Sequence, residues 1–473
     1  MVSSISIVGF AILTIAMLIA NRSRLVNLSI VSPSICTFAL WMLLLFWIAN
    51  VLFTIDQRFF ATISDHLFIK QINPLHPEVM VVVALLSGFS FLFGLILASR
   101  LDRQHSLDWS RWYREPIVTS DRSNWVDRHF WHLFLIACVM VFVYVSIIGG
   151  VSSVPLFVLI RGERYIDIVT AREESFKLLP RLFAYPFHML RLIVFPFLVC
   201  YGYLSARVTS GSSRKWARFV IVAIVGLLFS ASSTAHGPTA ELVIQLCLCE
   251  IFLARGSRKR AVLVYVFALA VVITLVLGQI ALWPDSSFDV SAEAIKIVSR
   301  KAIGKGFALF MDLAMFTNTF AEEPNIGFSG IPKIARLLGL EPFSIGNELY
   351  LYSVPSARVR TGTCNGPWFC YDYVCFGYIG VLLGSAAVGF VLGKLNLFFA
   401  TCSKDKVVIV LFVFTIVAAT GLFDTAPTRW LVSQGGILGA LALLIITRLA
   451  GSYRVSHKYV NNRYLSRKDL CQK

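Results

Sequence analysis

Charged residues are scarce in this sequence. Only 15% of the 473 residues are Asp, Glu, Lys or Arg, whereas 57% are hydrophobic, and the mean hydropathy is +0.75. A soluble globular domain carries about 25% charged residues, so the composition excludes that class. Apolar runs of about 20 residues, the length that spans a bilayer, recur along the chain. The sequence therefore predicts an all-α, polytopic integral membrane protein.

We expect about eleven membrane-spanning helices, with ten to twelve compatible with the pattern. They lie near residues 4–20, 33–55, 78–98, 131–149, 186–205, 218–233, 239–254, 261–283, 371–393, 406–423 and 430–447. The first run has no basic segment before it and no small-residue cleavage motif after it, so we interpret it as a retained span. No internal repeat is visible, which favours one integral domain over residues 1–473.

The positive charges are not spread evenly. The net charge of +17 could indicate a nucleic-acid partner, but the basic residues cluster in alternate connections between spans. By the positive-inside rule these connections, including the basic tail at 448–473, should be cytoplasmic, and the N-terminus should lie outside, in the periplasm of a bacterium. The same rule places outside the loops near 56–77, 150–185, 234–238, 284–370 and 424–429. We therefore expect membrane lipids and no nucleic acid as partners.

Motifs for metal and nucleotide chemistry are missing. The eight histidines are scattered and no H-E-x-x-H occurs, so no metal site is indicated. No closely spaced acidic pair stands in the first external loop, where Asp56 and Asp65 lie far apart. No Gly-rich loop leads into Lys-Ser or Lys-Thr, which argues against direct use of ATP. We predict neither a metal nor another cofactor.

The loop at 284–370 is too long to be a simple connector, because unstructured loops beyond about 15 residues are uncommon in compact domains. Apolar residues recur at helical spacing in 304–320, as expected of a helix lying at the membrane interface, and 331–343 shows a shorter version. Alternatively, either piece could be a packed lid or a short span. We expect a large external loop with interfacial helices.

The positive-inside rule does not account for arginines that are expected on the external side, so these residues need another explanation. One cluster, in 160–181, contains Arg161, Arg164 and Arg172 beside Glu173 and Glu174. A second consists of Arg358 and Arg360. The planar guanidinium group donates paired hydrogen bonds to phosphate and stays charged, so the clusters favour an anionic ligand. Pairing with neighbouring carboxylates or lipid headgroups is the alternative.

Two further external segments carry candidate residues. His236 stands at a tight turn before an apolar run, where an ionisable group at the mouth of a helix bundle is a site candidate or simply a solvated turn residue. Near the second arginine cluster, Cys364, Cys370 and Cys375 depart from the other cysteines, which lie mostly in spans. In an oxidising compartment, a bridge such as Cys364 to Cys370 could staple the loop.

Three stretches together resemble the oligosaccharide repeat-unit polymerases of the Wzy type, which build bacterial O-antigen. "GGVSSVPLFVLIRGERY" (149–165) is similar to the family's Gly-Gly, Pro-Leu-Phe and following arginine, and "SSTAHGPTAELVIQL" (232–246) to its polar turn before a long apolar helix. "RTGTCNGPWFCYDYVCFGYIGVLLG" (360–384) resembles its Thr-containing loop before an aromatic-Gly-x-x-Gly span start. Two positions depart from the family: His236 stands where arginine is common, and Cys375 where Asp often precedes Phe-Gly.

The resemblance implies a GT-C-like, metal-independent glycosyltransferase of the bacterial inner membrane. Its substrates would be undecaprenyl-pyrophosphate-linked oligosaccharides, joined at the periplasmic face, with a chain-length regulator as a further partner. The leaving pyrophosphate would be stabilised by arginines, and a base would take the acceptor's proton. The arginines are Arg161, Arg164, Arg172, Arg358 and Arg360, and the base candidates are Asp372, His236, Glu173 and Glu174. The aromatic residues Trp368, Tyr371 and Tyr373 could stack on sugar rings or form a membrane-interface belt.

Two other functions remain open. A flippase would move the same lipid-linked sugar without chemistry, but such families usually show internal repeats and lack a large external loop. An O-antigen ligase resembles the polymerases in architecture but carries a histidine in the large late loop. No histidine lies between 284 and 370, which favours the polymerase.

Overall fold

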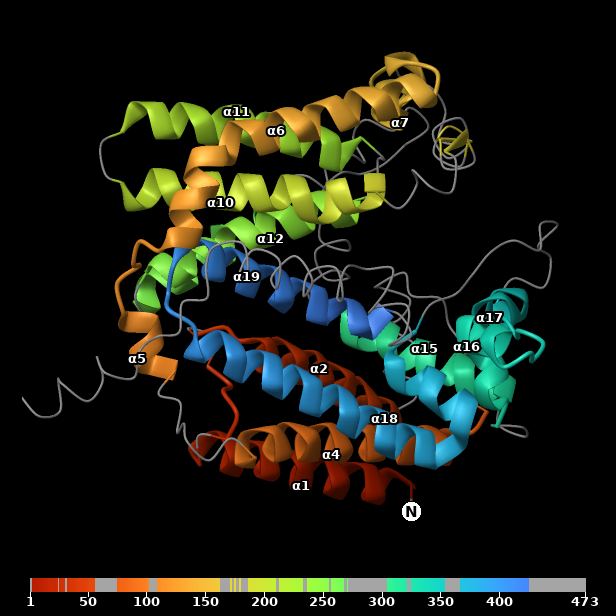
Figure 1. The fold of residues 1–473 in the computed structure, drawn as a ribbon. Coiled ribbons are helices and arrows are strands. Elements are labelled where there is room, and N and C mark those ends of the chain that lie inside the picture. The colour runs from red at the N-terminus through yellow and green to blue at the C-terminus, as the bar shows by residue number, and fades with distance from the viewer. Residues whose placement is uncertain are drawn as a thin grey trace, which may run out of the picture.

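The computed structural model is helical throughout the part of the chain that it describes, and it contains no strand there (Figure 1). This confirms the predicted all-α class. The described residues are 2–23, 25–29, 32–55, 75–101, 109–161, 171, 174–175, 178–179, 186–209, 212–232, 236–254, 257–267, 270, 304–320, 325–353 and 366–424.

Seven of the described helices are long and apolar enough to cross a membrane. They are α1 (Val2–Arg22), α2 (Ile35–Ile55), α4 (Pro77–Arg100), α6 (Asp121–Ile147), the segment Pro186–Val208 that contains η2 (Leu190–Val194) and α10 (Phe195–Val208), α18 (Trp368–Thr401), and α19 (Lys406–Thr420) with η4 (Gly421–Asp424). Each coincides with a predicted span. By length and apolarity the protein is therefore an α-helical, multi-pass membrane protein.

The other four predicted spans have different outcomes. Spans 218–233 and 239–254 are helices, α11 (Ser213–Ala231) and α12 (His236–Leu253), but they are not among those long and apolar enough to cross a membrane by themselves. Span 261–283 is helical as far as residue 267, and most of the remainder lies outside the described residues. Span 430–447 and the basic tail lie outside them as well.

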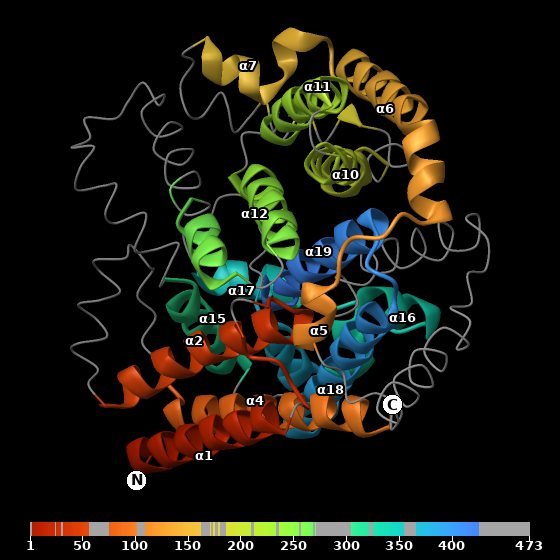
Figure 2. The same cartoon turned by 90° about the vertical axis from the view of Figure 1, so that its left-hand side faces the viewer.

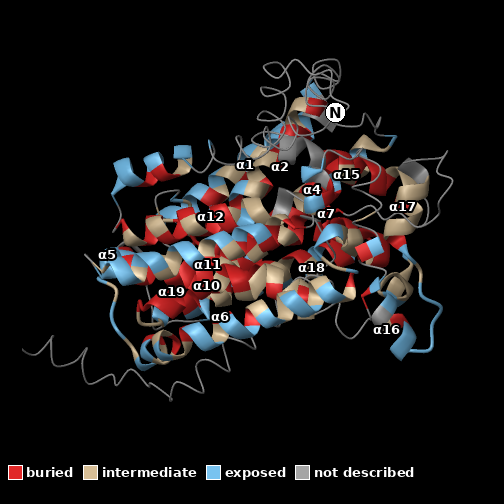
Figure 3. Cartoon of the chain, turned by 90° about the horizontal axis from the view of Figure 1, so that it is seen from above, coloured by how far each residue is buried: buried red, intermediate tan, exposed pale blue. Residues whose placement is uncertain are grey.

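The helices form two groups joined by α19 (Figures 1 and 2). Helices α1, α2, α4 and α18 pack together, with α15 (Gly304–Phe320) against α2. Helices α10, α11 and α12 form the second group with α6, and α19 contacts members of both. Buried apolar side chains form a core between the helices, whereas many other large apolar residues are exposed. Figure 3 shows buried and exposed residues on the same helices. An apolar exterior is what contact with lipid requires.

Helices α4 and α18 lie side by side with their backbones in contact. A Cβ atom added at Gly94 would overlap the backbone of Ala386, and one added at Gly389 would overlap the backbone of Phe91. At Gly393 it would meet the Cβ of Ala98. Small residues at such a contact allow two membrane helices to gain dispersion energy along their length, where water provides no driving force.

The basic connections gather at one end of the bundle, as the alternation of charge along the sequence predicts (Figure 1). The last residues of α4, α10 and α18 and the first residues of α11 and α19 lie there, beside α5 (Trp109–Arg114). We call this the basic end. Its described cations include Arg100, Arg114, Arg122, Arg207, Arg214, Lys215, Arg218, Arg258, Lys259, Arg260, Lys404 and Lys406. That it faces the cytoplasm stays a prediction.

Asp405 organises the junction of α6 and α19 at the basic end. Its fully buried carboxylate caps α19 by accepting a hydrogen bond from the backbone N–H of Val408 (2.9 Å). It also accepts from the hydroxyl of Ser120, the N-cap of α6 (2.8 Å), and pairs with Arg122 (3.0 Å). One carboxylate thus accepts from donors of two helices, and removing it would leave all of these donors without their acceptor.

Asp127 plays a similar part between α6, α11 and α19. It pairs with Arg218 of α11 (3.1 Å) and with Lys406 of α19. The guanidinium group of Arg218 also lies over the ring of Phe130, 4.2 Å from its centroid. Arg218 is therefore held by both a carboxylate and an aromatic face.

The opposite end holds the described parts of the long loop. Its helices are α15, α16 (Pro332–Leu337) and α17 (Ile345–Ser353), with η3 (Gly327–Gly330) between α15 and α16. Helix α15 coincides with the predicted helix at 304–320. Its residues 309–317 are nearly all buried, so it packs within the protein instead of presenting only one apolar face to a membrane surface. Near the same end lie η1 (Val151–Ser153) and α7 (Pro155–Ile160).

Candidate functional site

Helix α18 is broken near its start. Phe376 (φ −138°) and Gly377 (φ +61°, ψ −150°) are not helical, and a positive φ is tolerated at Gly377 because glycine has no Cβ. The indole of Trp368 donates to the hydroxyl of Ser385, 17 residues further along, at 3.1 Å. A straight helix would separate these residues by about 25 Å, so 368–375 folds back onto the rest of α18. We call residues 368–386 the hairpin; residues 368–375 are its first arm, and the part of α18 that follows Gly377 is its second arm.

Two glycines allow the arms of the hairpin to touch. A Cβ atom at Gly380 would overlap the backbone carbonyl of Asp372, and one at Gly384 would overlap the carboxylate of the same residue. The aromatic-Gly-x-x-Gly pattern at 376–380 thus supplies both the bend and the first point of close contact. The sequence suggested a span beginning here, and the structure adds the reversal before it.

The carboxylate of Asp372 lies between these arms. Its Oδ2 atom is buried and has no hydrogen-bond partner within the described part of the chain. Burying an ionisable group without a partner is costly, and in a membrane protein such residues usually mark a functional site. A carboxylate in this state can accept a proton from a neighbouring hydroxyl, which is the task of a general base. Asp372 was one of the four base candidates.

Helix α15 and the segment around η3 cover the hairpin. The ring of Phe316 packs edge-on against Tyr371, with centroids 5.1 Å apart. The backbone N–H of Ile326 donates to the carbonyl of Val374 (3.2 Å), and Phe328 contacts Phe376 (5.2 Å between centroids). The long loop therefore holds the first arm of the hairpin in place.

A second carboxylate, Asp312 of α15, belongs to the same region. Both Asp312 and Asp372 are close enough to the thiol of Cys370 to interact with it electrostatically. The sequence reasoning missed Asp312, although its signal was present: it is the single acidic residue of a largely apolar helix. Among the described residues, no group of three or more His, Cys, Asp or Glu side chains could hold a metal ion.

The three aromatic candidates differ in exposure. Trp368 is fully buried against Phe91 and Phe423, with ring centroids 5.7 Å and 4.9 Å away. Tyr373 is 1% exposed and packs beside Tyr378. Tyr371 is half-buried, so in this conformation it alone of the three keeps a partly open surface for a sugar ring.

Most of the arginine candidates lie outside the described residues: Arg164, Arg172, Arg358 and Arg360, together with Glu173. Arg161 is exposed at the end of α7, where its guanidinium group donates to the backbone carbonyls of Phe157 and Ser152. Glu174 is exposed. His236 begins α12, but its side chain is not described. Of the candidates that the structure describes, it brings together Trp368, Tyr371, Asp372 and Tyr373, all on the first arm of the hairpin.

The cysteines of this region are buried thiols. Cys370 and Cys375 are free, and a Cβ at Gly330 would lie 2.6 Å from the Cys375 sulfur. Cys364 lies outside the described residues. The bridge considered between Cys364 and Cys370 is therefore not formed, and packing against η3 and α15 takes the place of a covalent staple.

Comparison with known proteins adds no relative. No protein-family model, no curated protein and no solved structure matches the chain. The functional argument therefore rests on the residues and on the geometry of the hairpin.

Proposed function

We propose that the protein is an oligosaccharide repeat-unit polymerase of the bacterial inner membrane. Such an enzyme transfers a growing glycan from undecaprenyl pyrophosphate to the next lipid-linked repeat unit at the periplasmic face. The observation that carries the proposal is the buried, unpartnered carboxylate of Asp372 in the hairpin of α18. The chain reaches this hairpin directly from the segment that contains Arg358 and Arg360, which supports an anionic donor beside a base.

The proposed reaction exchanges one bond for another. A hydroxyl oxygen of the acceptor sugar attacks the anomeric carbon of the donor glycan, and the hydroxyl proton passes to Asp372. The bond between that carbon and the pyrophosphate oxygen breaks, and the pyrophosphate leaves with the electron pair. Arginines placed around it stabilise the transition state more than the ground state, because negative charge accumulates there during the step. Arg161, Arg164, Arg172, Arg358 and Arg360 are the proposed donors.

The finer parts of the proposal concern topology and partners. We place the N-terminus and the end opposite the basic end in the periplasm, and the C-terminus in the cytoplasm. The full bundle would have about eleven spans in a GT-C-like arrangement. Tyr371 would stack on a sugar of the substrate, and a chain-length regulator would bind the enzyme. No metal or other cofactor takes part in the proposed step.

The test is a gel of surface polysaccharide from cells that lack the gene. Wild type should restore a long-chain ladder, whereas Asp372→Asn, Arg161→Ala and Arg358→Ala at matched protein levels should leave a single repeat unit on the final acceptor. Glu341→Gln serves as the matched control, because Glu341 is an exposed carboxylate of the long loop and should restore the ladder. A long-chain ladder that persists after deletion of the gene would contradict the proposal.

A flippase is the second candidate, and one specific observation favours it. Broken helices with ionisable residues near the break occur at the substrate and ion sites of transporters. The same gel separates the two functions, since loss of a flippase, like loss of a ligase, would abolish every addition of sugar to the final acceptor, including the single repeat. Loss of a polymerase spares that repeat.

A further inference from the structure

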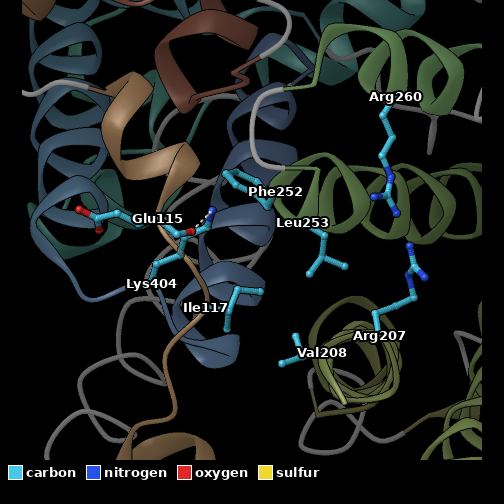
Figure 4. A pocket seen from close by; sticks show the side chains of 8 residues that line it. All are labelled: Glu115, Ile117, Arg207, Val208, Phe252, Leu253, Arg260 and Lys404. Atoms are coloured by element: carbon cyan, nitrogen blue, oxygen red, sulfur yellow. Dashed lines mark hydrogen bonds between the residues drawn. The ribbon is translucent and has the colours of Figure 1, made fainter. Parts of the chain in front are cut away.

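A pocket of about 320 Å³ opens at the basic end, at the end of the bundle opposite the hairpin. The end of α10, the end of α12 and the segment before α19 enclose it (Figure 4). Its lining residues are Glu115, Ile117, Arg207, Val208, Phe252, Leu253, Arg260 and Lys404. None of them was a candidate from the sequence, and the proposed polymerase does not use them.

Two arginines form one wall of the pocket. The guanidinium groups of Arg207, at the end of α10, and Arg260, from the helical segment at 258–267, point toward one another in Figure 4. Both pair with the carboxylate of Glu250, at 2.8 Å in the case of Arg207. One carboxylate thus faces two guanidinium groups, which leaves the wall with a net positive charge. The side chains are 34% exposed at Arg207 and 43% exposed at Arg260.

Glu250 fixes the geometry of this wall. Its carboxylate is 12% exposed and also accepts from the hydroxyl of Tyr203. It holds Arg207 through both Nε (3.2 Å) and a terminal nitrogen (2.8 Å), a two-bond arrangement that fixes the plane of the guanidinium group. The arginines are therefore positioned before any ligand arrives, which lowers the entropic cost of binding.

A third cation and an apolar floor complete the pocket. The ammonium group of Lys404 is held by the backbone carbonyls of Tyr113 (2.7 Å) and Glu115 (3.2 Å), whereas the carboxylate of Glu115 points away from the pocket in Figure 4. The remaining lining is supplied by the apolar residues Ile117, Val208, Phe252 and Leu253. A pocket with a cationic wall and an apolar floor matches an amphiphile that carries a negative headgroup.

We propose that this pocket binds the phosphate headgroup of an anionic phospholipid. Arg207 and Arg260 would donate to the phosphate oxygens, for which guanidinium is the best-matched side chain. The glycerol and upper acyl carbons would lie on the apolar floor. Basic pockets between membrane helices on the cytoplasmic side are suited to such headgroups, and the basic end is the one that the charge distribution assigns to that side. This inference does not depend on the proposed polymerase activity.

The test uses the purified full-length protein in detergent, titrated with dioctanoyl phosphatidylglycerol or, as the neutral lipid, dioctanoyl phosphatidylcholine. Binding is followed by intrinsic tryptophan fluorescence. Phosphatidylglycerol should bind and phosphatidylcholine should not. Arg260→Gln should weaken binding about fivefold, the value of one basic residue near an anionic surface. It leaves Glu250 paired with Arg207, and an unchanged melting temperature without lipid would confirm that the variant folds.

Arg258→Gln is the matched control, because Arg258 is exposed two residues earlier and does not line the pocket; it should bind like wild type. Equal losses in Arg258→Gln and Arg260→Gln would overturn the proposal in favour of diffuse electrostatic attraction. Inorganic phosphate that binds as tightly as the lipid would overturn the lipid assignment.

Discussion

Carboxylates with and without partners lie at different ends of the bundle. At the basic end, Asp127 and Glu250 each pair with two cations, and Asp405 pairs with one while capping a helix. At the other end, the Oδ2 atom of Asp372 has no partner in the described structure. A carboxylate with every partner in place serves the fold, whereas an unpartnered one costs stability and is retained for another reason. The comparison therefore distinguishes the carboxylates that stabilise the fold from the carboxylate that is the candidate functional group.

The largest effect should follow the loss of a satisfied carboxylate. Asp405→Ala removes the partner of Arg122 and the cap of α19, so we expect a loss of about 3–5 kcal/mol in the free energy of unfolding. Denaturant unfolding in mixed micelles measures it. A change below about 1 kcal/mol would mean that the hydrogen bonds and ion pair of Asp405 contribute little to stability. The distinction between partnered and unpartnered carboxylates would then not hold.

The close contact between the two arms of the hairpin can be disrupted by one substitution and restored by a second. Gly384→Ala places a methyl group against the Asp372 carboxylate, so we expect a loss of about 1–3 kcal/mol from overpacking. Adding Asp372→Ala should recover most of it, because the three atoms nearest to that methyl group belong to the side chain of Asp372. Gly380→Ala is the matched control: it meets the backbone carbonyl of Asp372, and the same second substitution should not relieve it. Equal rescue of both would contradict the hairpin.

Neutralising the unpartnered carboxylate should affect stability far less. Asp372→Asn keeps the shape of the side chain and removes a charge that no described partner offsets, so the free energy of unfolding should stay within about 1 kcal/mol of wild type or rise. The same micelle unfolding measures it beside Asp405→Asn. If the two variants lose equal stability, Asp372 has a structural partner and its assignment as a base fails.

The smallest expected effect is a difference in reactivity between the cysteine thiols at the two ends of the bundle. Burial raises the pKa of the Cys402 thiol, at the basic end, to about 11. Because only the thiolate reacts, alkylation of the partly exposed Cys402 should be slow at pH 7 and rise about tenfold per pH unit toward pH 10. Cys370 and Cys375 are buried under α15 and η3 and should stay unmodified. Peptide mapping by mass spectrometry follows each thiol, and modification of Cys370 in the folded protein would show that the hairpin is more open.

The helices could be predicted from the sequence because apolar length is a local property. In the described part of the chain, all seven helices long enough to span coincide with predicted spans, and α15 coincides with the helix expected at 304–320. The reversal at Gly377 could not be predicted, since it depends on contacts such as Trp368 with Ser385 that form only after the arms meet. Asp372 was a base candidate only through the reaction that the family resemblance implies. Its isolation, and the proximity of Asp312, depend on packing between distant segments.

The contact between α4 and α18 has a mechanical consequence. The second arm of α18 is fixed to α4 along a line where the two backbones touch, so that part of the helix behaves as a rigid post. The first arm is a short lever joined to the post through Gly377 and carries the Asp372 carboxylate. The long loop contacts the lever at Val374 and Phe376, so a force on that loop acts directly on the arm that carries the carboxylate.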